Sequence, residues 1–212
     1  SELLLPGYPI KTGQIYSSNR SLLPGKIAGN GAIPLLADTI AEDDLQTIAN
    51  AIEKAAFVSD MVIISGGTGD GVCDLVYNAF KYLNARTLFR GINIIPGRGT
   101  SAAIFNDKLL YNLSGNPSAA GVLFEALIKP ALLKLKGDLF SGREWFDIQL
   151  GSPIKNIKQC RSLCRGEMII NQGCVYAQPI SRKNFSIGNI PLILDLQAGQ
   201  GVTGDTVRAI LY

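Results

Sequence analysis

The chain has 212 residues, of which 47% are hydrophobic and 17% are charged, and a formal net charge of +3. A chain of this length folds around a core of its own, and its small, evenly spread charge argues against a nucleic-acid-binding function. No apolar stretch approaches the roughly 20 residues of a membrane span, and the absence of histidine excludes Ser-His, Cys-His and His-metal mechanisms made by this chain alone.

Up to Leu135, apolar runs of strand length alternate with amphipathic helical patterns, which predicts an α/β unit with a parallel sheet covered by helices. The expected strands are Ile33–Ala37, Met61–Ile64, Thr87–Ile94 and Lys108–Leu113. The expected helices begin at Ser18-Asn19, behind the acidic segment Glu42-Asp43-Asp44, near Leu75 and at Pro117, and the last runs to Leu135 with a bend at Pro130.

Beyond Gly137 the pattern changes to short β-like segments separated by Gly, Asn, Ser and Pro. These segments are Trp145–Leu150, Met168–Ile170, Val175–Ile180, Leu192–Leu196 and Thr206–Leu211. They predict a small all-β domain, either a half-open barrel or a sandwich. We therefore expect two domains, at residues 1–137 and 138–212.

A glycine-rich loop, Ser65-Gly66-Gly67-Thr68-Gly69-Asp70-Gly71, separates the strand Met61–Ile64 from the next helix. Glycines let backbone N–H groups approach a ligand at a helix N-terminus, where the helix dipole favours negative charge. The loop lacks the Gly-Lys-Ser/Thr of a P-loop and the spacing of G-x-G-x-x-G. A tight turn alone would explain two glycines, whereas four glycines in six positions favour an anion or polar-ligand site.

Two acidic positions accompany this loop. Asp74 follows it, and Asp43-Asp44 opens the preceding helix. Each carboxylate could simply cap its helix. The functional reading of Asp74, equally weighted, is a ligand of Mg²⁺ that is shared with phosphate oxygens. We expect both positions at the same edge of the sheet as the glycine-rich loop.

Two more loops follow expected strands. Ile95-Pro96-Gly97-Arg98-Gly99-Thr100-Ser101 places a cation among glycines, which suits a phosphate or another oxyanion, although a loop arginine is usually only solvated. The other loop, Leu113 to Ser118, leads into a helix with Pro117 at its first position. Its Asn116 could hydrogen-bond the edge of a heterocycle or brace the neighbouring loops.

The chain contains four cysteines, Cys73, Cys160, Cys164 and Cys174. Without a secretory signal pattern they predict reduced thiols and a cytoplasmic protein. The last three raise the possibility of a zinc site, but their spacing is not C-x-x-C, so small buried or half-buried side chains are the favoured reading.

Taken in order, these loops resemble the motifs of the MoeA family of molybdopterin molybdotransferases, which shares its molybdopterin-binding domain with the MogA/MoaB proteins and with gephyrin. The matching segments are Glu2-Leu3 with Gly13 to Asn19, Glu42-Asp43-Asp44, Ser65 to Asp74, Pro96-Gly97-Arg98, Gly115-Asn116-Pro117 and Ala198-Gly199 through Val207. The resemblance spans most of the chain. It implies a three-layer αβα fold with a mostly parallel sheet, followed by a small all-β C-terminal domain.

The function implied by this resemblance is a step of molybdenum cofactor biosynthesis, the insertion of molybdate into adenylylated molybdopterin with release of AMP, assisted by Mg²⁺. Asp74, Asp43 and Arg98 would be catalytic, and Asp74 and Asp43 would hold the metal, with Asp44 as the alternative to Asp43. The implied binding residues are Ser18, Asn19, Ser65, Gly66, Gly67, Thr68, Gly69, Asp70, Gly97, Gly115, Asn116 and Ser118. The implied partners are the small-molecule substrate and, in the full-length protein, a second copy in a homodimer.

Several positions depart from the family pattern. Ile95 and Arg98 replace the two lysines of KPGKP, Cys73 stands where the family usually has Glu, and Ser114 replaces the proline of PGNP. These departures leave three alternatives open: a non-catalytic molybdopterin carrier or sensor, a MogA-like adenylyltransferase suggested by Gly66 to Gly69, and a scaffold. The chain begins at Ser1 without the strand that precedes the first family motif, so we expect that strand to be missing and the chain to be a fragment.

Overall fold

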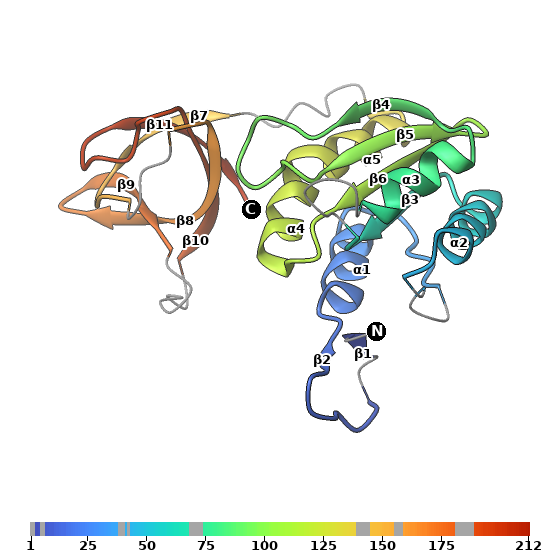
Figure 1. Ribbon diagram of the computed structural model, residues 1–212. Coiled ribbons are helices and arrows are strands. Elements are labelled where there is room, and N and C mark those ends of the chain that lie inside the picture. Colours follow the sequence, from blue (N-terminus) through green and yellow to red (C-terminus); the bar gives the residue numbers. More distant parts are fainter. Residues whose placement is uncertain are drawn as a thin grey trace. The chain divides into compact units, whose positions relative to one another are not determined.

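The computed structural model describes residues 3–4, 7–37, 41, 43–67, 74–138, 145–154, 159–180 and 189–212 (Figure 1). The chain forms two compact units. Unit 1 comprises Ser1–Ile92 with Gly97–Gly137, and unit 2 comprises Asn93–Pro96 with Asp138–Tyr212. None of the helices in the described ranges combines the length and the hydropathy that a bilayer crossing needs.

The helices of unit 1 form where the apolar periodicity predicts them. They are α1 (Asn19–Gly29), α2 (Leu45–Val58), α3 (Leu75–Tyr82), α4 (Pro117–Leu123), the π-helical segment η1 (Phe124–Ile128) and α5 (Lys129–Leu135). The helix expected from Pro117 to Leu135 is thus one run with a π-helical middle. In η1, the Lys129 N–H donates to the Phe124 carbonyl five residues back, immediately before Pro130, which has no N–H to donate.

The sheet of unit 1 is mixed, which corrects the expectation of a mostly parallel sheet. Its strand order is β3 (Met61–Ser65), β6 (Lys108–Leu113), β5 (Ser101–Phe105) and β4 (Arg86–Arg90). Only the β3–β6 pair is parallel, whereas β5 runs antiparallel to both β6 and β4. The cause is the hairpin between β5 and β6, where Asn106 and Asp107 adopt φ values of 48° and 60°. Such a two-residue turn suits Asn and Asp and joins antiparallel strands.

Two other strand predictions need correction. Residues 33–37 form no strand, because Pro34 interrupts the run and cannot donate to a ladder, and Ile33 is 86% exposed. The strand expected at Thr87–Ile94 ends at Arg90, because Gly91 turns the chain with φ 74°. A two-residue parallel pair, β1 (Leu3–Leu4) with β2 (Ile15–Tyr16), lies before α1.

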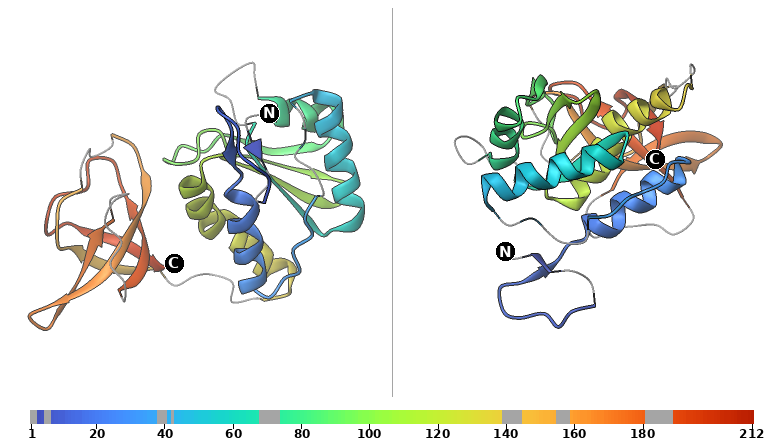
Figure 2. Two further views of the ribbon diagram at one scale, coloured as in Figure 1. Left: turned by 90° about the horizontal axis from the view of Figure 1, so that it is seen from below. Right: turned by 90° about the vertical axis from the view of Figure 1, so that its right-hand side faces the viewer.

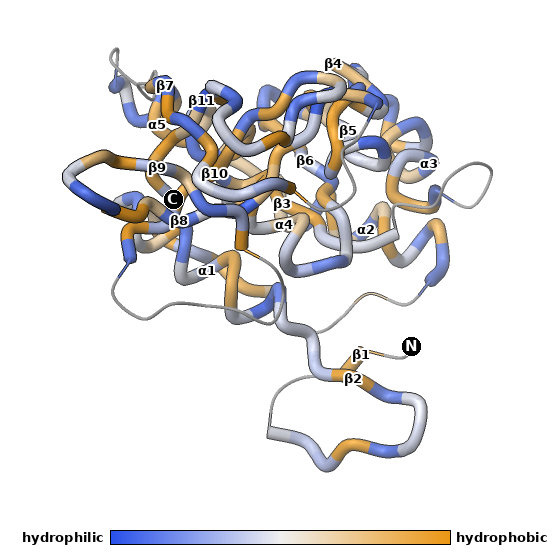
Figure 3. Tube along the Cα trace, turned by 90° about the vertical axis from the view of Figure 1, so that its left-hand side faces the viewer, coloured by the Kyte–Doolittle hydropathy of each residue, from blue (hydrophilic) through white to orange (hydrophobic). Residues whose placement is uncertain are grey.

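Helices cover both faces of the sheet (Figure 2). On one face α2 and α3 bury a core that includes Ile52, Phe80 and Leu110. On the other face α1 and the long helix bury Leu23, Phe124 and Tyr111 among others. Neighbouring residues of a strand point to opposite faces, so β6 contributes Leu110 to one core and Tyr111 to the other. A strand covered on both faces is apolar along most of its length, as β3 is in Figure 3.

Unit 2 is a closed five-stranded barrel of β7 (Phe146–Leu150), β8 (Ser162–Asn171), β9 (Cys174–Pro179), β10 (Ile190–Leu196) and β11 (Thr206–Leu211). All five predicted segments are strands, and the barrel is closed where a half-open barrel or a sandwich was expected. Ile95 joins this unit because its N–H donates to the Arg161 carbonyl at 3.1 Å and its carbonyl accepts from the Leu163 N–H at 2.7 Å.

Candidate functional site

One edge of the sheet of unit 1 collects the loops that the sequence singles out. Strands β3, β4 and β6 all point the same way, because β4 and β6 are each antiparallel to β5 and β3 is parallel to β6. Their carboxyl ends therefore lie at one edge, which we call the carboxyl edge. Ligands of open α/β sheets bind at this kind of edge.

The loops after β3 and β6 touch each other through backbone atoms. The Gly66 N–H donates to the Leu113 carbonyl at 3.0 Å. A Cβ on Gly115 would lie 3.4 Å from the Cα of Gly66, and a Cβ on Gly67 would lie 2.8 Å from Cγ2 of Val76 in α3. Gly67 also adopts φ 63°, where a side chain is strained. Glycine is thus required for packing at position 67. The glycines at this edge have no side chains, so they present only backbone atoms.

Helix N-termini meet at the same place. Asn19, the first residue of α1, donates from Nδ2 to the Gly115 carbonyl at 3.0 Å, which attaches the start of α1 to the loop after β6. The long helix begins at Pro117 in that loop, and α3 begins beside Gly67. Each N-terminus carries a partial positive charge. The carboxyl edge therefore favours an anionic ligand.

The side chain of Asn116 is committed to capping. Its Oδ1 accepts from the backbone N–H groups of Ser118 at 3.0 Å and Ala119 at 3.3 Å, and its own N–H donates to Ser114 Oγ at 3.2 Å. The contacts of Asn116 thus lie within its own loop and helix, and both expected roles, binding a heterocycle and bracing the neighbouring loops, stay predictions. Ser18 makes no capping hydrogen bond, and Ser18, Asn116 and Ser118 are all exposed.

The two acidic positions are both helix caps. Asp74 is 4% exposed, and its Oδ1 accepts the Tyr77 N–H at 3.0 Å. Asp44 Oδ2 accepts both the N–H and the hydroxyl of Thr47 at 2.8 Å, and the backbone bond lowers the pKa of Asp44. Both bonds use Oδ2 and leave Oδ1 of Asp44 outside the cap, and Asp43 is exposed, so either residue keeps a carboxylate oxygen for a ligand.

Within the described part of the chain, no contact joins Asp43 to Asp74. Gln46, at the second position of α2, donates to the hydroxyl of Tyr82, the last residue of α3, whereas Asp74 stands before its first residue. Eight helical residues span about 12 Å. Among the described residues, no group of three Cys, Asp or Glu side chains could hold a metal ion. A shared metal site of Asp43 and Asp74 thus stays a prediction.

Arg98 lies in the loop that follows β4, at the same carboxyl edge. The loop is closed by bonds from the Gly91 N–H to the Thr100 carbonyl at 2.7 Å and from the Thr100 N–H to the Gly97 carbonyl at 2.9 Å. Arg98 is exposed and forms no ion pair within the described ranges. Strand β4 is two strands from β6, so the loop starts about 10 Å away along the edge. The Arg98 guanidinium would therefore reach a ligand that extends about 10 Å along the edge from the loop after β6.

The predicted residues Thr68, Gly69 and Asp70 lie outside the described residues, as do Glu42 and Cys73. Of the other cysteines, Cys160 and Cys164 are half-buried and Cys174 is exposed, and all three are free thiols. Burial raises the pKa of the Cys164 thiol to about 12.

Sequence reasoning missed a group of buried polar side chains at the carboxyl edge. They are Asn112, Ser101 and Thr100, at 0%, 1% and 1% exposure. None of their side-chain oxygen or nitrogen atoms has a hydrogen-bond partner among the described residues, and neither has Asn19 Oδ1. The available signal was Asn112, a polar residue inside the apolar run Leu109–Leu113.

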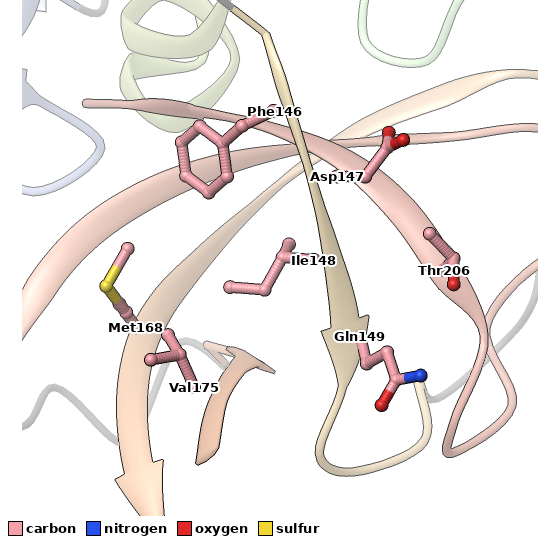
Figure 4. Close-up of a pocket in the computed structure, with 7 residues that line it drawn as sticks. All are labelled: Phe146, Asp147, Ile148, Gln149, Met168, Val175 and Thr206. Carbon is pink, nitrogen blue, oxygen red and sulfur yellow. The ribbon is translucent and has the colours of Figure 1, made fainter. Parts of the chain in front are cut away.

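Unit 2 has a hollow of about 500 Å³, but it does not suit the same chemistry. Figure 4 shows Phe146, Ile148, Met168 and Val175 on one side of β7 and Asp147, Gln149 and Thr206 on the other. None of the predicted site residues lines it. Apolar side chains with one carboxylate disfavour an anion, so the carboxyl edge of unit 1 is the better candidate.

Comparisons with known proteins match this part of the chain. Residues 1–134 match the family described as "Probable molybdopterin binding domain". The molybdopterin molybdenumtransferase of Bacillus subtilis (strain 168) is 36% identical over 132 residues, which are 62% of this chain and 30% of that protein. The protein of the same name from Nostoc sp. (strain PCC 7120) is 33% identical over 139 residues, 64% of this chain and 32% of that protein.

A solved structure matches both units. The crystal structure of the molybdopterin biosynthesis MoeA protein from Pyrococcus horikoshii has 25% identity and a TM-score of 0.80, and the match covers 99% of this chain and 51% of that one. The chain thus spans about a third of the length of the curated relatives and about half of the solved chain.

Proposed function

The chain belongs to the family of molybdopterin binding domains, in which it resembles the MoeA proteins, and we propose that it inserts molybdate into adenylylated molybdopterin during synthesis of the molybdenum cofactor, with release of AMP. The observation that carries this proposal is the carboxyl edge, where the glycine turns at Gly66, Gly67 and Gly115 meet the N-termini of three helices. Molybdopterin carries a phosphate, and molybdate is itself an oxyanion. Backbone N–H groups at helix N-termini bind anions of both kinds.

We assign roles to the residues of this edge as follows. The glycine turns hold the phosphate or molybdate oxygens, and Arg98, exposed and without an ion pair in the described ranges, neutralises their charge. Asn116 keeps its Oδ1 in the helix cap, which leaves its Nδ2 to donate to the substrate. Ser18 and Ser118, exposed at helix N-termini, present hydroxyl donors.

The residues present also fit a divalent cation held in part by the substrate. Asp74 uses Oδ1 for its helix cap, and its second oxygen has no partner among the described residues. Mg²⁺ is commonly bound through one or two carboxylates plus phosphate oxygens, and it supplies charge neutralisation at the phosphate that leaves. Asp74 would be its protein ligand, with Asp43 as a candidate second carboxylate.

We propose that the full-length protein works as a cytoplasmic homodimer, as the resemblance implies. Free thiols at Cys160, Cys164 and Cys174 are consistent with a reducing compartment. Large apolar side chains at Ile33 and Phe57, 86% and 90% exposed, supply surface for a subunit contact. The reported curated relatives are named molybdenumtransferases and do not favour a carrier or an adenylyltransferase.

The proposal is tested by AMP release from adenylylated molybdopterin in the presence of molybdate and Mg²⁺. The informative variant is Asp74→Asn, because asparagine caps a helix as well as aspartate but is a poor metal ligand. The matched control is Asp44→Asn, which makes the same change at a cap without a proposed metal. Release by the wild type and by Asp44→Asn, with loss in Asp74→Asn at unchanged stability, supports the proposal. Equal release by both variants removes Asp74 from the mechanism.

A further inference from the structure

Two polar side chains are buried side by side at the carboxyl edge of unit 1. Ser101 of β5 and Asn112 of β6 pair directly in register, so they share one face of the sheet with Cβ atoms about 5 Å apart. Asn112 is 0% and Ser101 is 1% exposed. Neither amide atom of Asn112 nor the hydroxyl of Ser101 has a hydrogen-bond partner in the described ranges.

The face on which this pair lies is the face of α3. Two residues before Asn112, and so on the same face, Leu110 packs into the core that contains Val76 of α3. On the other side of Ser101, the paired residue Arg90 stacks its guanidinium on the ring of Tyr77, at 4.3 Å from the ring centroid. The first turns of α3 therefore lie over the Asn112–Ser101 pair.

The pair also lies directly below the glycine turn. Asn112 stands opposite Ile64 in the parallel pair β3–β6, one residue before the Ser65–Leu113 pair that ends both strands. One residue is about 3.3 Å along a strand. Gly67 packs on Val76 at the start of α3, so the turn, the helix N-terminus and the polar pair border one region.

Packing alone gives no reason for polar residues at these two positions. Their neighbours on the same strands and face, Leu110 and Ala103, are fully buried apolar residues. A buried polar atom without a partner costs stability, whereas an apolar pair of similar size would not. Buried polar groups that fold stability does not explain point to a ligand.

We infer that Asn112 and Ser101 determine the ligand specificity of this site by taking a neutral ring edge that carries a donor beside an acceptor, such as the lactam edge of a fused heterocycle. An amide offers both a donor and an acceptor, a hydroxyl offers either, and neither is charged. An oxyanion alone, which only accepts, cannot satisfy the Asn112 oxygen. The anionic end of the ligand lies at the glycine turn, and the ring lies between that turn and α3.

This inference rests on the proposed function and deepens it, because it assigns the heterocyclic part of molybdopterin to named residues. The pair is covered in the structure, so ligand entry moves the first turn of α3. That movement is measurable as faster hydrogen exchange at the Tyr77 N–H, which Asp74 holds at 3.0 Å.

The test uses two probes on the whole chain, a phosphate-free pterin and inorganic phosphate. The variants are Asn112→Leu and Ser101→Ala, which remove the polar atoms at similar volume. Thr100→Val is the matched control, because Thr100 is equally buried and unpartnered among the described residues but lies in the loop before β5, outside the strand pairing that joins Ser101 to Asn112. We expect Asn112→Leu to weaken pterin binding at least about tenfold, to leave phosphate binding unchanged within about twofold, and to raise the melting temperature. Thr100→Val should leave both affinities unchanged.

The outcomes separate this inference from the proposed function. A chain that releases AMP from adenylylated molybdopterin but binds pterin equally well in wild type, Asn112→Leu and Ser101→Ala refutes the inference alone. A lower melting temperature in Asn112→Leu with unchanged pterin affinity shows a purely structural pair and also refutes it. If Asn112→Leu does not fold, Ser101→Ala decides the matter. A wild-type chain that binds no molybdopterin refutes both.

Discussion

The contact between Gly67 and Val76 fixes the start of α3 against the glycine turn, and its strength can be worked out from the structure. In Gly67→Ala the new Cβ meets Val76 Cγ2 at 2.8 Å while the residue keeps φ 63°. A side chain in the left-handed region costs about 1–2 kcal/mol, and overpacking costs typically 1–3 kcal/mol more. We therefore expect Gly67→Ala to lower the free energy of unfolding by about 2–5 kcal/mol.

A double-mutant cycle isolates the steric part. Val76 is 3% exposed, so Val76→Ala alone should cost about 2 kcal/mol. It also removes the methyl group that clashes, so the double variant should be more stable than the sum of the two losses by about 1–3 kcal/mol.

Gly137→Ala is the matched control, because Gly137 has φ 82° with nothing within 4 Å of an added Cβ. It should show the backbone cost of about 1–2 kcal/mol alone. Urea unfolding followed by far-ultraviolet circular dichroism suits this cycle, since the described helices belong to unit 1. Additivity of Gly67→Ala and Val76→Ala within about 0.5 kcal/mol would refute the contact.

Three more predictions follow from single contacts. Asn116→Ala removes the cap of the long helix and should destabilise unit 1 by about 1 kcal/mol in urea unfolding, whereas Asn116→Asp keeps the cap and should cost less. Asp195→Asn breaks the bidentate pair with Arg161 at 2.8 and 2.7 Å. Because Asp195 is buried and Arg161 is half-exposed, we expect the barrel to lose about 2–3 kcal/mol of unfolding free energy, measured by Trp145 fluorescence. Burial raises the pKa of Cys164 to about 12, so its thiol stays protonated near neutral pH. The alkylation rate of Cys164 should therefore rise steeply only as the pH approaches 12. Mass spectrometry after alkylation at pH 8 should find the exposed Cys174 modified well before Cys164.

Periodicity and capping residues predict the helices of unit 1 because each of these signals is local. The helix starts at Asn19, Leu45, Leu75 and Pro117 all lie where polar or proline residues precede an apolar stripe. The five strands of the barrel are similarly local, since alternation and turn residues mark each one. What local signals do not carry is the pairing of strands.

Strand β5 shows why the sheet was predicted wrongly. Ser101 to Phe105 contains small residues that read as a loop, although the Asn106-Asp107 turn after it is a hairpin signal. With β5 absent, β4 and β6 read as neighbours in a parallel sheet. In the structure, β5 lies between them and runs antiparallel to both.

The candidate site was predictable as far as its loops go. The glycine turns and Asn19 meet at the predicted edge because each follows a strand or begins a helix there. The joint position of Asp43 and Asp74 was not predictable, because it depends on how α2 crosses α3, which sequence spacing does not set. Asn112 and Ser101 were missed because they become neighbours only through the pairing of β5 with β6.

The central claim, that the carboxyl edge binds the anionic end of molybdopterin, is tested most directly by reversing its charge preference. Ser118 is exposed at the second position of the long helix. Ser118→Asp places a carboxylate at a helix N-terminus, which the dipole favours, so the protein should be as stable as the wild type or slightly more stable. The same carboxylate repels a bound phosphate, by about 1 kcal/mol at 4 Å even in bulk water.

The measurement is a titration of the wild type, Ser118→Asp and the neutral control Ser118→Asn with adenylylated molybdopterin. The account predicts binding at least about fivefold weaker in Ser118→Asp than in Ser118→Asn, with the difference shrinking as salt is added. Equal affinity in all three proteins at low salt would contradict it, because no anion could then lie at this helix N-terminus.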